Sequence, residues 1–178
     1  SIGYFSGSKT HDQDFEVAEE ALLEVMKEHP EVRLKLVGVL SDRKMEKFGN
    51  KVEKLPFMDW KQLPSVMAGI DINLMPLENT LFHWCKSENK WTEAALVKVP
   101  SVMSRNCEME YVVENGKDGW MCTTKEEWVN ALEALVTDEK ARKAMGEAAH
   151  QKVMEHYLTV NTGKDAMEEL LCSESYTK

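Results

Sequence analysis

The sequence predicts an α/β protein whose centre is a doubly wound parallel sheet of about six strands, with helices on both faces. Short apolar runs that are typical of buried strands alternate along the chain with segments whose apolar residues recur at helical spacing. The run Leu34–Leu40, for example, is almost continuously apolar, as in a parallel strand buried on both faces. With 178 residues, the chain can form one full core. We therefore expect a single domain over 1–178, with its core in 1–160 and a helix and tail in 161–178.

Each expected strand is a short run of β-branched and other apolar residues. In chain order the runs are Ile2–Phe5, Leu34–Leu40, Val52–Phe57, Asp71–Leu77, Val99–Met103 and Trp120–Cys122. Right-handed crossovers between parallel strands place all carboxyl ends on one edge of the sheet. The loops on that edge are then Ser6–Gln13, Leu40–Lys51, Phe57–Trp60, Leu77–Ser87 and Ser104–Met109. Since ligands of such sheets bind outside the carboxyl ends of the strands, we expect a ligand across these loops.

The helices between the strands are predicted from start and stop signals. Thr10-x-x-Gln13 and Thr124-x-x-Glu127 fit capping boxes, in which two side chains satisfy the free N–H groups of a helix start. His29 precedes a proline and therefore ends the first helix. Two further helices are expected before the middle of the chain ends: Trp60–Ala68, with Pro64 in its first turn, and one that begins at Ser87. Three more follow: Glu108–Glu114, ended by Asn115-Gly116, one capped by Thr137-Asp138 that runs to about His156, and Thr162–Cys172. The segment Ser41–Asn50 is expected to be an exposed loop or loose helix.

The composition excludes some classes of partner. The net charge is −9, from 22 basic and 31 acidic residues. This balance argues against binding to nucleic acid or to an anionic membrane surface, because both need a basic footprint. No apolar run approaches the roughly 18 residues of a membrane span. A single small anion remains compatible, since a helix start and one or two lysines outweigh a distant acidic surface.

The four cysteines, Cys85, Cys107, Cys122 and Cys172, have no C-x-x-C spacing. This pattern suggests neither a zinc site nor a disulfide framework, and favours reduced thiols in the cytoplasm. No metal-ligand set is visible, and no cofactor is expected. The chain does not begin with Met and opens within a strand pattern, so we expect it to be a piece of a longer protein.

The segment Leu81–Ser104 carries the strongest signal for a site. It follows an apolar run, enters a helical pattern at Ser87 and ends in a β-branched run. Ser87 is a good N-cap, and Lys86 and Lys90 add positive charges where a helix start already favours an anion. Glu93 lies one and a half turns further on, where its carboxylate could accept bonds from sugar hydroxyls. The alternatives are a capped helix with a solvated lysine face and a surface glutamate.

Other residues give weaker signals. Gly7-Ser8 could offer backbone N–H groups to a phosphate, but a plain turn explains them equally well, and there is no G-x-G-x-x-G or P-loop motif. His11 in the same turn is more often a solvated or capping residue. Asp12, Asp14 and Asp71 suggest a receiver-type phosphoacceptor pocket. That pocket needs acidic residues at two strand ends, however, and Asp71 precedes its strand.

Several motifs together resemble a known family. They are IGYFSGSKTHDQDF, DINLMPL, KSENKWTEAALVKVPSVMS, the run Val112–Trp120, and Glu127-Trp128 with Ala131-Leu132. In this order and spacing they resemble the C-terminal half of a group 1, family 4-like, retaining glycosyltransferase. The resemblance covers nearly the whole chain. It implies one Rossmann-like half of a GT-B fold, which binds a UDP- or GDP-linked sugar donor while a missing N-terminal domain binds the acceptor.

The resemblance also implies roles for individual residues. Glu93 takes the position of the glutamate that bonds the donor ribose, Lys86 and Ser87 lie where the diphosphate is wrapped, Ser6-Gly7-Ser8 resembles the phosphate-facing loop, and Phe57-Met58 lie where the base sits. The family's arginine and lysine after the first strand are missing, so we expect Lys86 and Lys90 to stabilise the leaving group, with His11 assisting.

One departure limits the resemblance. The earlier of the family's two glutamates falls on Cys85, which cannot bind sugar hydroxyls as a carboxylate does. The function implied is sugar transfer with retention from a nucleoside diphosphate, for example in polysaccharide biosynthesis, in the cytoplasm or at a membrane through the missing part. The alternative is a non-catalytic nucleotide- or sugar-phosphate-binding module of the same fold.

Overall fold

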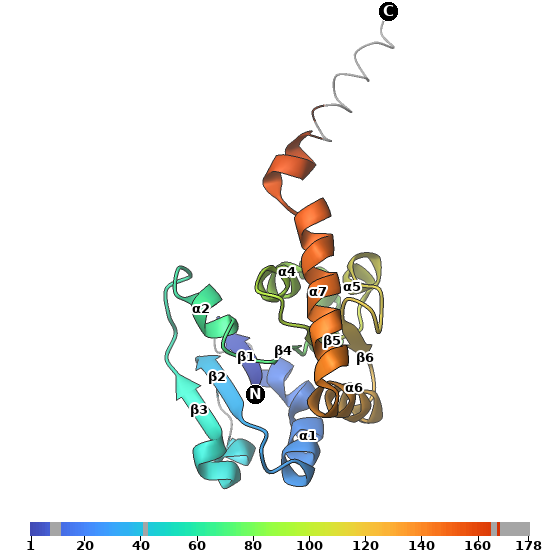
Figure 1. Cartoon of the computed structure of the whole chain (residues 1–178). Coiled ribbons are helices and arrows are strands. Elements are labelled where there is room, and N and C mark those ends of the chain that lie inside the picture. Colours follow the sequence, from blue (N-terminus) through green and yellow to red (C-terminus); the bar gives the residue numbers. More distant parts are fainter. Residues whose placement is uncertain (8–11, 41–42, 165–166, 168–178) are drawn as a thin grey trace, which may run out of the picture.

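A six-stranded parallel sheet lies at the centre of the computed structural model, which describes residues 1–7, 12–40, 43–164 and 167 (Figure 1). Its strands are β1 Ile2–Ser6, β2 Leu34–Gly38, β3 Val52–Leu55, β4 Ile72–Met75, β5 Ser101–Ser104 and β6 Trp120–Cys122. Their order is β3-β2-β1-β4-β5-β6, so the direction of winding reverses between β1 and β4. The predicted fold class is confirmed, and this reversal marks the switch point at which such sheets bind ligands.

Helices cover both faces of the sheet. They are α1 Asp12–Glu28, α2 Leu63–Met67, α3 Leu81–Trp84, α4 Asn89–Leu96, α5 Cys107–Val112, α6 Lys125–Thr137 and α7 Glu139–His156, with the 3-10 segment η2 Arg43–Lys51 before β3. Alternate strand residues face opposite sides. Tyr4 and Leu74 pack against α1 and α6, whereas Phe5 packs with α2 and α4, and Met75 with α4, α5 and α7. Figure 1 shows α1 beside α6, and α4 beside α7.

The predicted helix signals are largely confirmed. Thr124 and Glu127 form a complete capping box at the start of α6, and the Asp138 side chain accepts the N–H groups that begin α7. Helix α1 ends two residues before Pro30, and Pro64 lies in the first turn of α2. The capping box predicted at Thr10 lies outside the described residues. So do most residues of the last expected helix, although the chain is already helical from residue 159.

The prediction was wrong about the helix start near Ser87. An additional helix, α3, fills the expected loop because the Thr80 hydroxyl accepts the N–H of His83 and starts a turn there. The backbone N–H of Lys86 then bonds to His83, and helical geometry resumes only at Asn89, with Glu88 at the N-cap position. Ser87 is therefore exposed and caps no helix.

The turn at Gly116 was also assigned the wrong role. Helix α5 already ends at Val112, and Val113 continues in an extended conformation. Gly116 does have the positive φ expected of glycine, at 82°, but it closes a turn in which its N–H donates to the carbonyl of Gly119.

Among the residues that the structure describes, no helix combines the length and the hydropathy that crossing a bilayer requires.

Candidate functional site

Two neighbouring cavities lie at the carboxyl edge of the sheet. The larger has a volume of about 430 Å³ and is lined by Phe5, Ser6, Gly7, Val37, Phe57, Met58, Asp59, Trp60, Leu63, Asn89, Lys90 and Glu93. The smaller has a volume of about 320 Å³ and is lined by Met75, Pro76, Leu77, Lys86, Ser87, Asn89 and Lys90. Asn89 and Lys90, in the first turn of α4, belong to both walls. The two cavities therefore meet at the start of this helix.

The cavities bring together most of the residues predicted from the sequence. Ser6, Gly7, Phe57, Met58, Lys90 and Glu93 line the larger cavity, and Lys86, Ser87 and Lys90 line the smaller one. Ser8 and His11 lie outside the described residues. Among the other lining residues, Asp59 and Trp60 fall in the predicted edge loop Phe57–Trp60 but were not singled out, and Asn89 directly precedes Lys90. Their positions in or beside predicted segments were the signal for them in the sequence.

The ends of β1 and β2 form the floor of the larger cavity. The Ser6 hydroxyl donates a hydrogen bond of 2.8 Å to the carbonyl of Val39 and ties the two strand ends together. Gly38 has a φ of +102°, and a Cβ there would lie 1.9 Å from the Ser6 carbonyl oxygen. Only glycine permits this close approach, which fixes the backbone that leads into Gly7.

Aromatic and aliphatic side chains form one wall of the larger cavity. Phe57 and Trp60, in the loop between β3 and α2, are 66% and 74% exposed. Such exposure of large aromatic rings beside a cavity is typical of a surface that a ligand covers. Flat rings of this kind stack on heterocyclic bases.

Lys90 lies at the boundary between the two cavities. Its Nζ atom is buried, has no hydrogen-bond acceptor among the described residues, and lies 5.3 Å from the centroid of the Tyr4 ring. Burial lowers the pKa of Lys90 to about 8, an effect that nearby Asp14 opposes and Lys86 reinforces. A buried ammonium without an acceptor is costly, so the site is suited to an anion that supplies one.

Lys86 is held by Asp14, a fully buried carboxylate in the first turn of α1. Its Nζ donates to Oδ2 of Asp14 at 3.2 Å. Oδ1 accepts from the backbone N–H of Glu78 at 3.0 Å, and Nε2 of His83 lies 3.0 Å from the same oxygen. We call Asp14 with these three partners the Asp14 junction. It joins α1 to the segment that leads into α4, and neither Asp14 in this role nor His83 was predicted from the sequence.

The Asp14 junction includes a group of potential metal ligands, because ligand atoms of Asp14, Glu78 and His83 lie within 4.8 Å of one another. The Asp14 oxygens, however, already accept an N–H and an ammonium, and the His83 imidazole lies 3.0 Å from one of them. Lys86 also places a positive charge where a cation would have to lie. The contacts therefore describe a hydrogen-bonded junction between two segments.

Glu93 faces the larger cavity from the middle of α4. Partial burial raises its pKa, and the nearby Lys90 opposes that shift. No hydrogen bond or ion pair of its side chain is formed within the described part of the chain. Its oxygens are thus available to accept bonds from a ligand.

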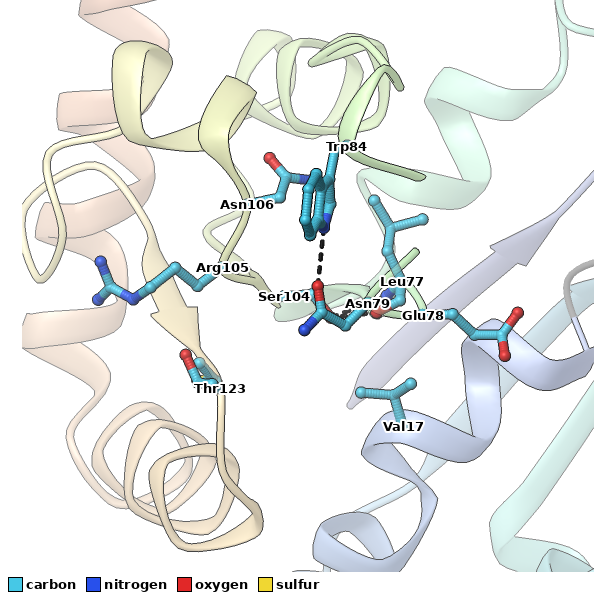
Figure 2. Close-up of a pocket in the computed structure, with 10 residues that line it drawn as sticks. Val17, Leu77, Glu78, Asn79, Trp84, Ser104, Arg105, Asn106 and Thr123 are labelled. Atoms are coloured by element: carbon cyan, nitrogen blue, oxygen red, sulfur yellow. Dashed lines mark hydrogen bonds between the residues drawn. The ribbon is translucent and has the colours of Figure 1, made fainter. Parts of the chain in front are cut away.

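A third, smaller cavity of about 150 Å³ lies on the other side of α3 (Figure 2). In Figure 2, the Trp84 indole donates to the Asn79 side chain at 2.7 Å, and Arg105 and Thr123 line the opposite wall. None of the predicted site residues lines this cavity. Cys85, the residue where the family pattern breaks, is exposed at the end of α3, with its thiol directed to the carbonyl of Leu81.

Known proteins resemble the chain in sequence pattern and in fold. The family model described as Glycosyl transferases group 1 matches residues 1–138. No curated protein matches the chain in sequence. The C-terminal domain of LpcC, a glycosyl transferase group 1 family protein from Francisella tularensis, superimposes with a TM-score of 0.69 at 17% identity, over 88% of this chain and 85% of that one.

Two longer proteins have the same fold over part of their length. HepE from Anabaena, solved in complex with UDP and glucose, superimposes with a TM-score of 0.77 at 19% identity, over 96% of this chain and 48% of that one. WaaG, a glycosyltransferase involved in lipopolysaccharide biosynthesis, gives a TM-score of 0.71 at 18% identity, over 93% and 46% of the two chains. This chain thus spans about half the length of these proteins. It belongs to the group 1 glycosyltransferases and has the fold of their C-terminal domain, one Rossmann-like half of the GT-B architecture.

Proposed function

We propose that the chain binds the nucleoside-diphosphate sugar from which its parent enzyme transfers the sugar to an acceptor. The observation that carries the proposal is the buried ammonium of Lys90, which has no acceptor among the described residues and lies where the two cavities meet. A diphosphate would supply that acceptor. The solved complexes of HepE with UDP and with UDP-glucose, a protein of the same fold, support the assignment of ligand class.

The two cavities suggest how the donor is divided between them. The larger one has an aromatic wall for a base and the Glu93 carboxylate for ribose hydroxyls. The smaller one has Lys86 and Lys90 for the phosphates, with Ser87 and the chain before α4 beside them. In this arrangement the diphosphate spans the shared wall at Lys90, and the sugar lies in or beyond the smaller cavity.

The proposed chemistry is sugar transfer with retention at the anomeric carbon. As the bond from sugar to phosphate breaks, negative charge develops on the departing diphosphate. Lys86, Lys90 and the N-terminal N–H groups of α4 would stabilise this charge in a partly buried site, where electrostatic interactions are stronger than in water. The acceptor would bind to a separate N-terminal domain, so the isolated chain should bind donor without turning it over.

The test is a titration of the chain with UDP, GDP, uridine and guanosine by NMR and calorimetry. We expect a dissociation constant on the order of 1 mM, or about 4 kcal/mol, because half of the cleft is absent. The diphosphates should bind more tightly than the nucleosides, and the better pair identifies the base. Equal binding of nucleosides and nucleoside diphosphates would refute the proposal.

A second candidate is a non-catalytic module that binds nucleotides or sugar phosphates. Cys85 favours it, since a thiol stands where the family's earlier glutamate is expected. Both candidates predict donor binding, and they differ in turnover.

For either candidate function we propose a cytoplasmic location, which the free thiols of Cys85, Cys107 and Cys122 support.

A further inference from the structure

Asp14 connects two parts of the chain that are more than 60 residues apart. From the start of α1 its carboxylate reaches the backbone of Glu78, the ring of His83 and the ammonium of Lys86. The segment between Glu78 and Lys86 has little regular structure apart from the four-residue helix α3. Its conformation therefore depends on contacts of this kind more than on its own helical hydrogen bonds.

His83 joins the Asp14 junction to the start of α3. Its Nε2 atom lies 3.0 Å from Oδ1 of Asp14. Its other ring nitrogen, Nδ1, lies 2.6 Å from the hydroxyl of Thr80, which starts α3. Both ring nitrogens of His83 thus have polar neighbours. Since His83 lies three residues before Lys86, these contacts help to place that lysine.

The charges of the site also depend on Asp14. The Lys86 ammonium bonds directly to the Asp14 carboxylate, and the negative charge of Asp14 acts on the buried Lys90 as well. Asp14 offsets part of the charge of the two lysines at the smaller cavity, while Glu93 acts on Lys90 from the larger one. Without the carboxylate, two like charges would face each other in a partly buried site, and one of them would be lost.

We propose that Asp14 is a positioning residue of the donor site, which holds Lys86 at the wall of the smaller cavity and allows both lysines to meet the diphosphate. The inference rests on the proposed donor-binding function. Asp14 itself touches no ligand in this arrangement, since it is fully buried behind Lys86. It acts through the lysine that it holds.

The test compares Asp14→Asn with the unchanged chain in titrations with UDP and uridine, and follows the ³¹P resonances of UDP. Loss of one charge-assisted contact predicts UDP binding about tenfold weaker or more, with uridine binding unchanged. The change of the ³¹P shifts on binding should shrink in parallel. Asp14→Glu, which keeps the carboxylate, should restore part of the preference for UDP.

Glu19→Gln is the matched control. Glu19 is a second buried carboxylate of α1 and pairs with Lys44 at 2.6 Å, away from both cavities. The Glu19→Gln variant should lower the melting temperature as Asp14→Asn does, yet leave the ratio of UDP affinity to uridine affinity unchanged. This comparison separates a general loss of stability from a specific effect on the phosphate site.

A double-mutant cycle with Lys86→Gln decides how Asp14 acts. If Asp14 works through Lys86, the double variant binds UDP no more weakly than Lys86→Gln alone. Additive losses, or an unchanged UDP-over-uridine ratio in Asp14→Asn, would overturn the inference. If Asp14→Asn does not fold, as judged by circular dichroism, the same cycle with Asp14→Glu gives the answer. A wild-type chain that does not prefer UDP to uridine or GDP to guanosine refutes the proposed function instead.

Discussion

The Lys90 ammonium lies 5.3 Å from the centroid of the Tyr4 ring, and no oxygen of the described residues accepts a hydrogen bond from it. A cation–π contact contributes about 0.5–2 kcal/mol, which offsets only part of the solvation that a buried ammonium loses. The Tyr4 hydroxyl cannot serve as a counter-ion, because burial raises its pKa further. The folded chain thus maintains a charge that reduces its own stability.

Lys90→Met should stabilise the chain and weaken donor binding at the same time. Methionine fills a similar volume without a buried charge, so we expect a gain of about 1–3 kcal/mol in the free energy of unfolding. Affinity for UDP should fall about tenfold or more because the diphosphate loses a charged partner. Thermal denaturation and calorimetry measure the two effects. Lys143→Met, at an exposed position of α7, should change neither quantity; a destabilised Lys90→Met variant would contradict the account of Lys90.

UDP affinity should fall as the pH rises through about 8. Burial lowers the pKa of Lys90 to about 8, so the folded chain without ligand loses this charge above that pH. Uridine affinity should stay constant over the same range. In Lys90→Arg the guanidinium remains charged, so its UDP affinity should not fall near pH 8. Calorimetric titrations between about pH 7 and 9.5 test both statements.

The lowered pKa of Lys90 also predicts how the stability of the folded chain depends on pH. Between about pH 8 and 10.4, lysine in the unfolded chain still carries its proton while folded Lys90 does not. The unfolded state then binds more protons, so the contribution of Lys90 to stability increases with pH in this window. Urea denaturation at several pH values should show this increase relative to Lys90→Met. The inference fails if the two chains have parallel pH profiles.

Glu93→Gln should weaken uridine and UDP binding by a similar factor. The ribose belongs to both ligands, and loss of a charged acceptor for its hydroxyls should cost about tenfold in affinity. This pattern differs from that of the lysine variants, which should affect only UDP. Glu155→Gln serves as the control, because Glu155 lies at the end of α7 and lines neither cavity. An effect of Glu93→Gln restricted to UDP would instead place Glu93 near the phosphates.

Gly146→Ala should disrupt the packing of α7 against the turn between α4 and β5. A Cβ at Gly146 would lie 2.1 Å from the carbonyl oxygen of Lys98, and a backbone atom cannot move aside as a side chain can. We expect a loss of about 2 kcal/mol or more in unfolding free energy. Gly163→Ala meets nothing within 4 Å and lies in a helical stretch, so it should be neutral or slightly stabilising. Chemical denaturation compares the two.

Turnover by the parent enzyme should respond to the residue at position 85. If the chain is half of an active transferase, Cys85→Ser should keep activity with the natural donor, since the thiol cannot act as the missing carboxylate. Cys85→Glu would restore the family pattern and alter the selectivity for the donor sugar. Transfer of radiolabelled sugar by a chain that includes the acceptor domain measures both. Absence of turnover in the unmodified protein, despite donor binding, would favour the non-catalytic module.

Much of the fold was predictable because it depends on local patterns. The apolar runs identified all six strands to within a few residues, and the Thr124–Glu127 box and the proline after His29 fixed helix ends. The parallel order then placed Ser6, Phe57 and Lys86 at one edge. The start of α4 was not predictable, because the separate helix α3, capped by Thr80, comes first and helical geometry resumes only at Asn89.

The sequence by itself determined the alternation of strands and helices, the family, and the chain segments that meet at the carboxyl edge of the sheet. Only the tertiary structure decided that Asp14 is buried against His83 and Lys86, and that the Lys90 ammonium finds no hydrogen-bond acceptor in the part of the chain that the structure describes. Periodicity reports which face of an element is apolar, because burial of apolar area follows the repeat of the backbone. The burial of a charge and the identity of its partner depend on residues more than 60 positions away, and no local pattern encodes that distance.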